Sequence, residues 1–184
     1  TTISAPLDRI ASAASRPHRR LAHLLWALNM CDPVFGLYRT SYLKRTQLIG
    51  PFFGADYVLL AELVMLGQIR EINEVLFRLR AHPKRSMKAH ASKRARAAWY
   101  DPSAGRKRFV LPNWERMVWE LLKSAAGFPI PLTDKLRCCA VIPLVHYWRR
   151  FRSAGGRWKA RLKAKLGLLP GKQAVSSHAR SPQP

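Results

Sequence analysis

The sequence predicts an α/β fold over residues 1–110, and three patterns indicate it. Apolar and basic residues alternate in Val75–His82, which is typical of a half-buried strand. Asp56–Leu66 is apolar on nearly every side, which is typical of a buried helix, and Gly67 is expected to end it in the left-handed conformation. Arg16–Asn29 places its leucines on one side, as an amphipathic helix does.

Shorter elements lie between these segments. Asp32–Arg39 is predicted to be a short buried strand, with Gly36 where two backbones approach closely. A short helix is expected to begin at Thr40 or Ser41, both of which are capping residue types. Gln68–Asn73 is predicted to be a further strand. Strands and helices therefore alternate along this part of the chain.

The remainder of the chain is predicted to be helical and then irregular. Residues 111–167 are expected to form a basic helical extension, interrupted near Pro143 and again at Gly155-Gly156. Residues 168–184 have the composition of a disordered tail. The domain prediction is thus an α/β part, a helical extension and a tail.

The net charge of +23 over 184 residues is concentrated in two segments. Residues 78–108 contain eleven basic residues and one acid, and residues 131–184 contain twelve basic residues and one acid. A field of this strength favours a polyanionic partner: a nucleic acid, an anionic lipid or a phosphorylated substrate.

The N-terminal residues and the cysteines indicate the cellular compartment. The first residues, TTISAPLDRIASAAS, contain neither a starting methionine nor the apolar core of a signal peptide. Cys31, Cys138 and Cys139 form no paired framework and are expected to be buried thiols in a reducing compartment. We therefore expect a cytoplasmic protein, peripheral on the inner face of the cell membrane if it binds lipid, and a chain that continues upstream.

Asp56 stands at the start of the most apolar helix, and two roles are open to it. A carboxylate there can cap the helix by accepting backbone N–H bonds. Alternatively, a rigid buried helix can hold the acid at a cleft as a general base, because a base must be fixed within reach of the proton it takes. The two roles are compatible.

Arg78, Arg80 and His82 fall on one side of the predicted strand Val75–His82. Charge on an edge strand can serve only to keep it soluble. The same residues could instead bind the phosphates of a donor, since guanidinium groups bind phosphate oxygens bidentately. His82 could also ligate a metal.

The order of these features resembles the second half of a family-2 glycosyltransferase, from about Cys31 to about Ser86. The segments that carry the resemblance are FGLYRTSYL, GADYVLLAELVMLG and VLFRLRAH. It implies the C-terminal, acceptor-side part of a GT-A-type, Rossmann-like catalytic domain. It also implies inverting transfer of a sugar from a nucleotide-sugar to an acceptor hydroxyl, in glycan or bacterial cell-envelope polysaccharide synthesis.

The resemblance also assigns residues. It implies that Asp56 is the base that deprotonates the acceptor, although Ala55 replaces the acid that usually precedes it. It implies donor-phosphate binding by Arg80 and His82, joined by Arg78 if that side chain turns inward. The expected acceptor pocket consists of Phe35, Gly36, Tyr38, Phe53 and Gly54; ordinary core packing is the alternative for its aromatic residues.

The family's metal motif is missing from this sequence. No D-x-D occurs, so the main ligands of the Mg or Mn ion expected in the complete enzyme lie elsewhere, and His82 is the one candidate ligand. We expect the nucleotide-binding half to lie upstream of Thr1 and this chain to be inactive alone.

Further partners follow from charge. Aromatic and basic residues interleave in residues 149–165, which suits a helix on an anionic membrane surface, and a solvated basic extension is the alternative. The expected small partners are a nucleotide-sugar donor and a glycan or lipid-linked acceptor. A catalytically inactive, basic nucleic-acid-binding module is the rival function; it is less favoured because the chain contains no helix-turn-helix, zinc or RNA-recognition signature.

Overall fold

The structure is a computed structural model that describes residues 2–4, 10–81, 92–101 and 113–165. It divides into two compact units, Thr1–Trp148 and Arg149–Pro184. The described part is helical, and the predicted α/β, Rossmann-like fold is wrong. Of the strands that the sequence predicted, only Val75–His82 contributes a strand to the described part, and that strand has one short neighbour. Without further neighbours, a period-two pattern cannot form a layer.

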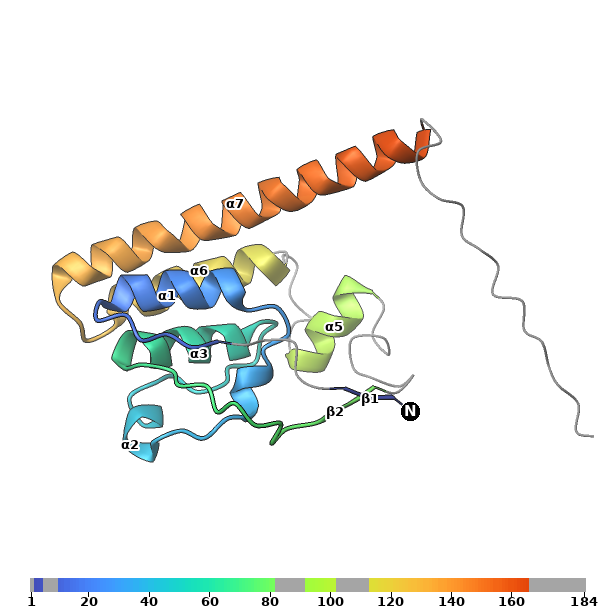
Figure 1. Cartoon of the computed structure of the whole chain (residues 1–184). Helices are drawn as coiled ribbons and strands as arrows, with labels where there is room; N and C mark the ends of the chain where they lie inside the picture. The colour runs from blue at the N-terminus through green and yellow to red at the C-terminus, as the bar shows by residue number, and fades with distance from the viewer. Residues whose placement is uncertain (1, 5–9, 82–91, 102–112, 166–184) are drawn as a thin grey trace, which may run out of the picture. The chain divides into compact units, whose positions relative to one another are not determined.

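The elements follow one another as helices with two very short strands (Figure 1). The helices are α1 (Pro17–Ala27), the 3₁₀ helix η1 (Asp32–Phe35), α2 (Thr40–Leu43), α3 (Ala55–Leu66), α5 (Lys93–Tyr100), α6 (Asn113–Gly127) and α7 (Leu132–Lys165). The strands β1 (Thr2–Ser4) and β2 (Leu79–Ala81) pair antiparallel, with Ile3 opposite Arg80. None of the described helices is long and apolar enough to cross a bilayer.

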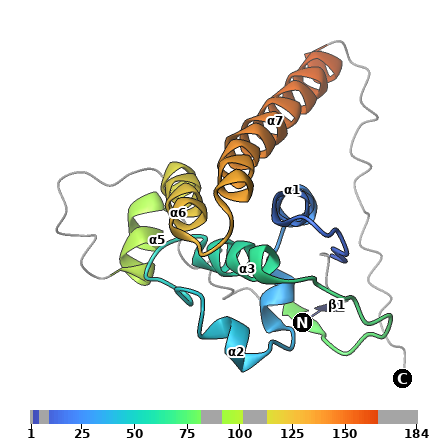
Figure 2. The ribbon, with the colours of Figure 1, turned by 90° about the vertical axis from the view of Figure 1, so that its left-hand side faces the viewer.

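Helix α3 lies at the centre of the core. It packs against α1 and against α6, which lie on either side of it in Figure 2. Leu60 and Val64 of α3 are completely buried, and Leu21 and Leu24 of α1 meet them in one cluster. The first turns of α7 add Cys138 and Ile142. The burial of α3 on most sides confirms the expectation drawn from its apolar sequence.

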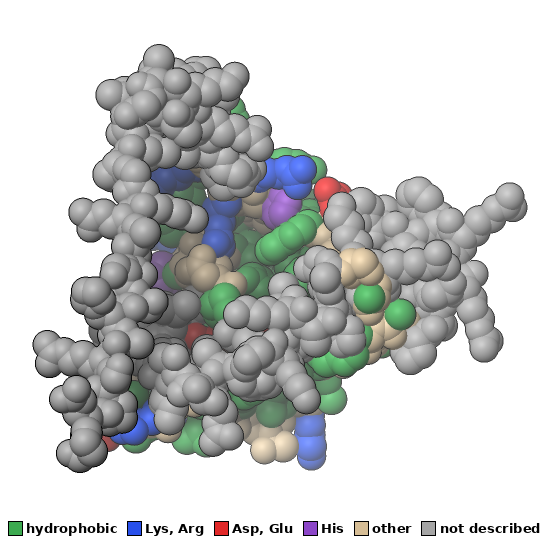
Figure 3. All heavy atoms as spheres, turned by 90° about the vertical axis from the view of Figure 1, so that its right-hand side faces the viewer, with side chains coloured by type: hydrophobic (Ala, Val, Ile, Leu, Met, Phe, Trp, Pro, Cys, Tyr) green, Lys and Arg blue, Asp and Glu red, His purple; other side chains and the backbone are tan. Residues whose placement is uncertain are grey.

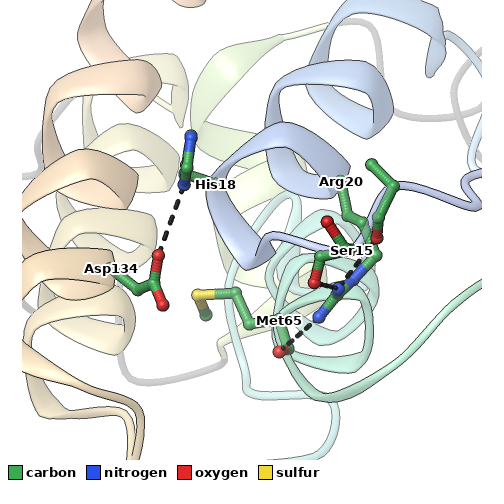
Figure 4. Close-up of polar contacts among 6 residues, drawn as sticks. Ser15, His18, Arg20, Met65 and Asp134 are labelled. Atoms are coloured by element: carbon green, nitrogen blue, oxygen red, sulfur yellow. Dashed lines mark hydrogen bonds and ion pairs between the residues drawn. The ribbon is translucent and has the colours of Figure 1, made fainter.

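Arg20 is the polar link between α1 and the end of α3. Its side chain is 6% exposed, and its guanidinium donates hydrogen bonds to the carbonyl oxygens of Val64 and Met65 (2.6 and 3.0 Å) and of Ala14 and Ser15 (3.0 and 2.7 Å; Figure 4). The last carbonyls of a helix have no partner within it, so this side chain takes the place of a C-terminal cap.

Glu62 is a second buried charge, 1% exposed in the middle of α3. Its carboxylate accepts a hydrogen bond from Ser124 Oγ of α6 at 2.6 Å and one from the backbone N–H of Gln47 at 2.8 Å. A buried polar group is tolerated when it is hydrogen-bonded, so Glu62 joins α6 and the loop before α3 through one side chain.

Several predicted elements differ from the structure. Asp32–Arg39 begins with η1 and continues as exposed chain, and Leu37 is 97% exposed, so the predicted buried strand is wrong. Gln68–Asn73 forms only one isolated bridge, between Ser12 and Ile69. Regular strand in Val75–His82 is limited to β2. Gly67 does end α3, but in an extended conformation (φ −157°) that any residue adopts.

Helix α7 continues through Pro143 and through Gly155-Gly156, where the sequence predicted interruptions. Proline removes one N–H donor and glycine weakens helical propensity, but neither is sufficient here to end the helix. Cys31 and Cys138 are buried free thiols, as expected, and Cys139 is partly exposed.

Candidate functional site

Asp56 lies in the first turn of α3, and its side chain is partly exposed. The cap position itself is Gly54, which makes no side-chain hydrogen bond. Asp56 Oδ1 accepts a hydrogen bond from the N–H of Tyr57 at 3.0 Å, so the carboxylate still satisfies one free donor of the first turn. The rest of α3 behind it is buried, which fixes the backbone that carries this acid.

The entry to α3 requires a glycine at position 54. Gly54 has φ +82°, in the left-handed region, and a Cβ added to it would lie 2.8 Å from Met117 Sδ. Two independent constraints, the backbone conformation and the close approach of α6, therefore determine the direction in which the chain enters the helix. The predicted site residues Phe53, Gly54 and Asp56 are brought together by this entry.

Aromatic side chains surround the start of α3. The Phe53 ring lies 5.7 Å from Trp114 at the start of α6 and 6.0 Å from Tyr100 at the end of α5, both edge to face. Tyr57 lies 6.5 Å from Trp114, and its hydroxyl donates to the carbonyl oxygen of Asn29 at 2.7 Å. We call Phe53, Tyr57, Tyr100 and Trp114 the aromatic group. Two of its members, Phe53 and Tyr57, are close to Asp56 in sequence, and their rings contact Tyr100 of α5 and Trp114 of α6.

The exposure of this group suits contact with a ligand. Trp114 is 46% exposed although it contacts Phe53 and Tyr57, so part of its surface is open to solvent. Figure 3 views the molecule from the side on which α5 lies in Figure 1, and the described surface that it shows includes hydrophobic, basic and other side chains together. The entry to α3 thus combines a partly exposed carboxylate with a ring, Trp114, that is partly open to solvent.

A second group of predicted site residues lies between η1 and β2. Phe35 stacks on Phe77 with ring centroids 4.9 Å apart, and Phe77 directly precedes Arg78, which is exposed. The predicted acceptor residue Phe35 is therefore next to the predicted phosphate-binding segment. Arg80 lies in β2, and His82 lies outside the described residues.

Tyr38 has a structural environment. Its hydroxyl donates a hydrogen bond to the carbonyl oxygen of Pro33, and its ring packs against the core. Burial raises the pKa of Tyr38 to about 12, assisted by Cys31 and opposed by a backbone hydrogen bond from Gly36. Gly36 and Tyr38 thus both help to shape the turn after η1, and the acceptor role predicted for them stays a prediction.

The described residues contain no group of three or more His, Cys, Asp or Glu side chains that could hold a metal ion. The metal predicted from the family resemblance therefore has no ligand set in this part of the chain. Sequence reasoning also missed Tyr57, Tyr100 and Trp114 as members of the site. Tyr57 and Tyr100 are 43 positions apart, and Tyr100 and Trp114 are 14 positions apart, so no local sequence pattern groups them.

Comparison of this chain with protein-family models, with curated proteins and with solved structures finds no match. The resemblance to family-2 glycosyltransferases thus remains a prediction from the sequence, and the function has to be argued from the site.

Proposed function

We propose that this chain supplies the acceptor side of an inverting, nucleotide-sugar-dependent glycosyltransferase, with Asp56 as general base. Asp56 removes the proton of an acceptor hydroxyl, the oxygen attacks the anomeric carbon, and the nucleoside diphosphate leaves from the opposite face. The observation that carries the proposal is a partly exposed carboxylate in the first turn of a buried helix, where its sequence neighbours Phe53 and Tyr57 contact the exposed ring of Trp114.

The aromatic group supports a sugar as ligand. One face of a pyranose ring presents C–H groups, which pack on aromatic rings, while its hydroxyls point outward to polar groups. Trp114 and Phe53 offer such rings, and Asp56 offers the polar acceptor beside them. An acceptor seated on Trp114 would then present a hydroxyl to the carboxylate.

The leaving phosphates need positive charge. Arg78 is exposed and is adjacent to the Phe35–Phe77 stack, and the proposal assigns phosphate binding to it because a guanidinium binds phosphate oxygens bidentately. Arg80 and His82 follow it at the spacing of the strand, and they join it in the proposal on the sequence pattern alone. The described residues provide no ligand set for a metal ion, so the proposal assigns the phosphates to these side chains.

The test is transfer of sugar from a nucleotide-sugar by the protein at its full natural length, comparing wild type with Asp56→Asn. Loss of a general base is expected to lower kcat by about 10²- to 10⁴-fold. Glu74→Gln, at an exposed position outside the site, is the matched control and is expected to leave the rate unchanged. Unchanged transfer by Asp56→Asn, with helix content preserved, would remove Asp56 from the mechanism.

Nucleic-acid binding is a second candidate, favoured by the net charge of +23. The basic helix α5 carries Trp99, which is 52% exposed, and a base can stack on such a ring. Binding of this kind weakens steeply with salt because phosphate contacts release counterions. Titration of a single-stranded RNA at two salt concentrations measures it, and a Kd that does not change with salt argues against this function.

A further inference from the structure

The side of α7 that carries Leu132, Leu136, Ala140, Leu144 and Tyr147 is exposed and apolar, and we call these residues the α7 stripe. The four large ones are 69%, 63%, 69% and 63% exposed, in chain order. They all belong to the first compact unit. A single exposed leucine is ordinary on a protein surface, but a contiguous row over four turns of one helix marks an interaction surface.

The α7 stripe is distinct from the side of α7 that holds the core together. At 3.6 residues per turn, its members fall within an arc of about 120°. Cys138 and Ile142, which are fully buried against α1 and α3, lie on the opposite side of the helix. The apolar character of the stripe is therefore additional to what folding requires.

Within α7, the charged residues that flank the α7 stripe are basic. Lys135 and Arg137 lie at its two edges, and Arg137 is exposed. The one acid of the helix, Asp134, is 4% exposed and lies 3.4 Å from His18 Nδ1 of α1, on the core side (Figure 4). The positive charge continues along the sequence, because residues 149–165 contain eight basic residues and no acid.

From this juxtaposition we propose that the α7 stripe docks on the surface of an anionic lipid bilayer. An interfacial helix buries an apolar face of this width among the acyl chains and places its basic edges at the phosphates. The stripe lies N-terminal to residues 149–165, where the sequence pattern alone placed membrane contact.

Two other occupants fit the surface less well. A second copy of the chain would bring two surfaces of positive charge together, in a protein that already carries +23. A nucleic acid would match the charge and could stack a base on Tyr147, but the three leucines of the stripe, Leu132, Leu136 and Leu144, offer it neither a ring nor a hydrogen-bond donor. An anionic bilayer can accommodate the leucines among its acyl chains and can pair its phosphates with the basic residues.

The experiment is flotation of the 184-residue chain with vesicles of phosphatidylcholine, with and without phosphatidylglycerol. Wild type is expected to float with the anionic vesicles and to bind neutral ones more weakly. The triple variant Leu136→Ser, Leu144→Ser and Tyr147→Ser keeps every charge, and is expected to bind anionic vesicles about 50-fold more weakly because it loses three inserted apolar side chains.

The matched control changes three exposed apolar residues elsewhere: Ile72→Ser, Val75→Ser and Leu76→Ser. It is expected to bind like wild type. Binding by the stripe variant within twofold of wild type overturns the proposal, since charge alone would then suffice. The proposal is also overturned if the triple variant loses binding to RNA but still binds the anionic vesicles. If the triple variant unfolds, Leu136→Ser and Leu144→Ser are measured singly, with about fivefold weakening expected from each. This outcome is independent of sugar transfer.

Discussion

Arg20 Nε of α1 lies 2.6 Å from the carbonyl oxygen of Val64, 44 positions away in α3. Burial lowers the pKa of this guanidinium, and the neighbouring Cys138 and Asp134 oppose that effect. The group has the geometry of a cap supplied from another helix. It makes four hydrogen bonds, two of them to carbonyls at the end of α3, where the helix itself supplies no donor, and two to the chain before α1.

Arg20→Ala is therefore expected to lower the free energy of unfolding by about 3 kcal/mol, because buried carbonyls lose their donors. Arg20→Lys is expected to recover only part of this, since an ammonium cannot reproduce the planar arrangement of donors. Urea denaturation measures both. Arg19→Ala, one position away and exposed, is the control; equal effects at 19 and 20 would contradict the capping role.

Ser124→Ala leaves the buried Glu62 carboxylate without the 2.6 Å hydrogen bond from α6. We expect a loss of about 1 to 3 kcal/mol, the cost of a buried acceptor that loses a charged hydrogen bond. Combining it with Glu62→Ala in a double-mutant cycle isolates the pair, because each substitution removes one side of the contact. Additive effects of the two substitutions would show that the contact contributes nothing to stability.

Gly54→Ala is expected to destabilise the protein by about 1 to 2 kcal/mol, because a left-handed backbone and the nearby Met117 sulfur both oppose a Cβ. Gly127→Ala is the matched change at the end of α6, where an added Cβ meets nothing within 4 Å. It is expected to be neutral or slightly stabilising. Thermal unfolding of the two variants separates them, and an equal shift in Tm would refute the conformational argument.

Trp114→Ala tests the aromatic group as an acceptor platform in the proposed enzyme. It is expected to raise the KM for acceptor about tenfold, with a smaller change in kcat, because it removes a ring that the acceptor contacts before and during reaction. Trp119→Ala, on α6 and 60% exposed, is the control. A KM unchanged in Trp114→Ala would place the acceptor elsewhere.

Stability is expected to fall at alkaline pH through Cys138. Burial, with Asp134 and Cys139, raises the pKa of this thiol from 9.0 to about 11, and Arg20 opposes the shift. The folded state holds the proton more tightly than the unfolded state, so the contribution is complete below pH 9 and is lost as pH rises to 11. Urea denaturation across this range measures the slope. Cys138→Ala is expected to reduce it, and an unchanged slope would assign the effect to other groups.

The helices could be predicted from the sequence wherever one side of them faces the core. The leucines of α1 and the apolar run of α3 repeat at helical spacing because those residues pack together. Arg20 and Glu62 escaped prediction for the opposite reason. Each is a charged residue within a helix, and only the contacts made from 44 and 62 positions away show that it is buried.

Local sequence patterns were not sufficient to predict the sheet or the full set of residues at the candidate site. Alternation in Val75–His82 describes a chain that fits a sheet, but a sheet also needs neighbours, and the described residues pair only β1 with β2. At the site, Phe53, Gly54 and Asp56 could be grouped because they are close in sequence. Trp114 reaches them only through the packing of α6 on α3, which no short motif records.

Because α3 is enclosed by α1 and α6 for most of its length, water reaches its backbone only when those neighbours move apart. The amide hydrogens of Leu60 and Val64 should then exchange with deuterium at the rate of global unfolding. Those of β1 and β2, which have a single partner strand each, should exchange long before. The exchange rates of the α3 amide hydrogens thus report the rate at which the whole core unfolds cooperatively.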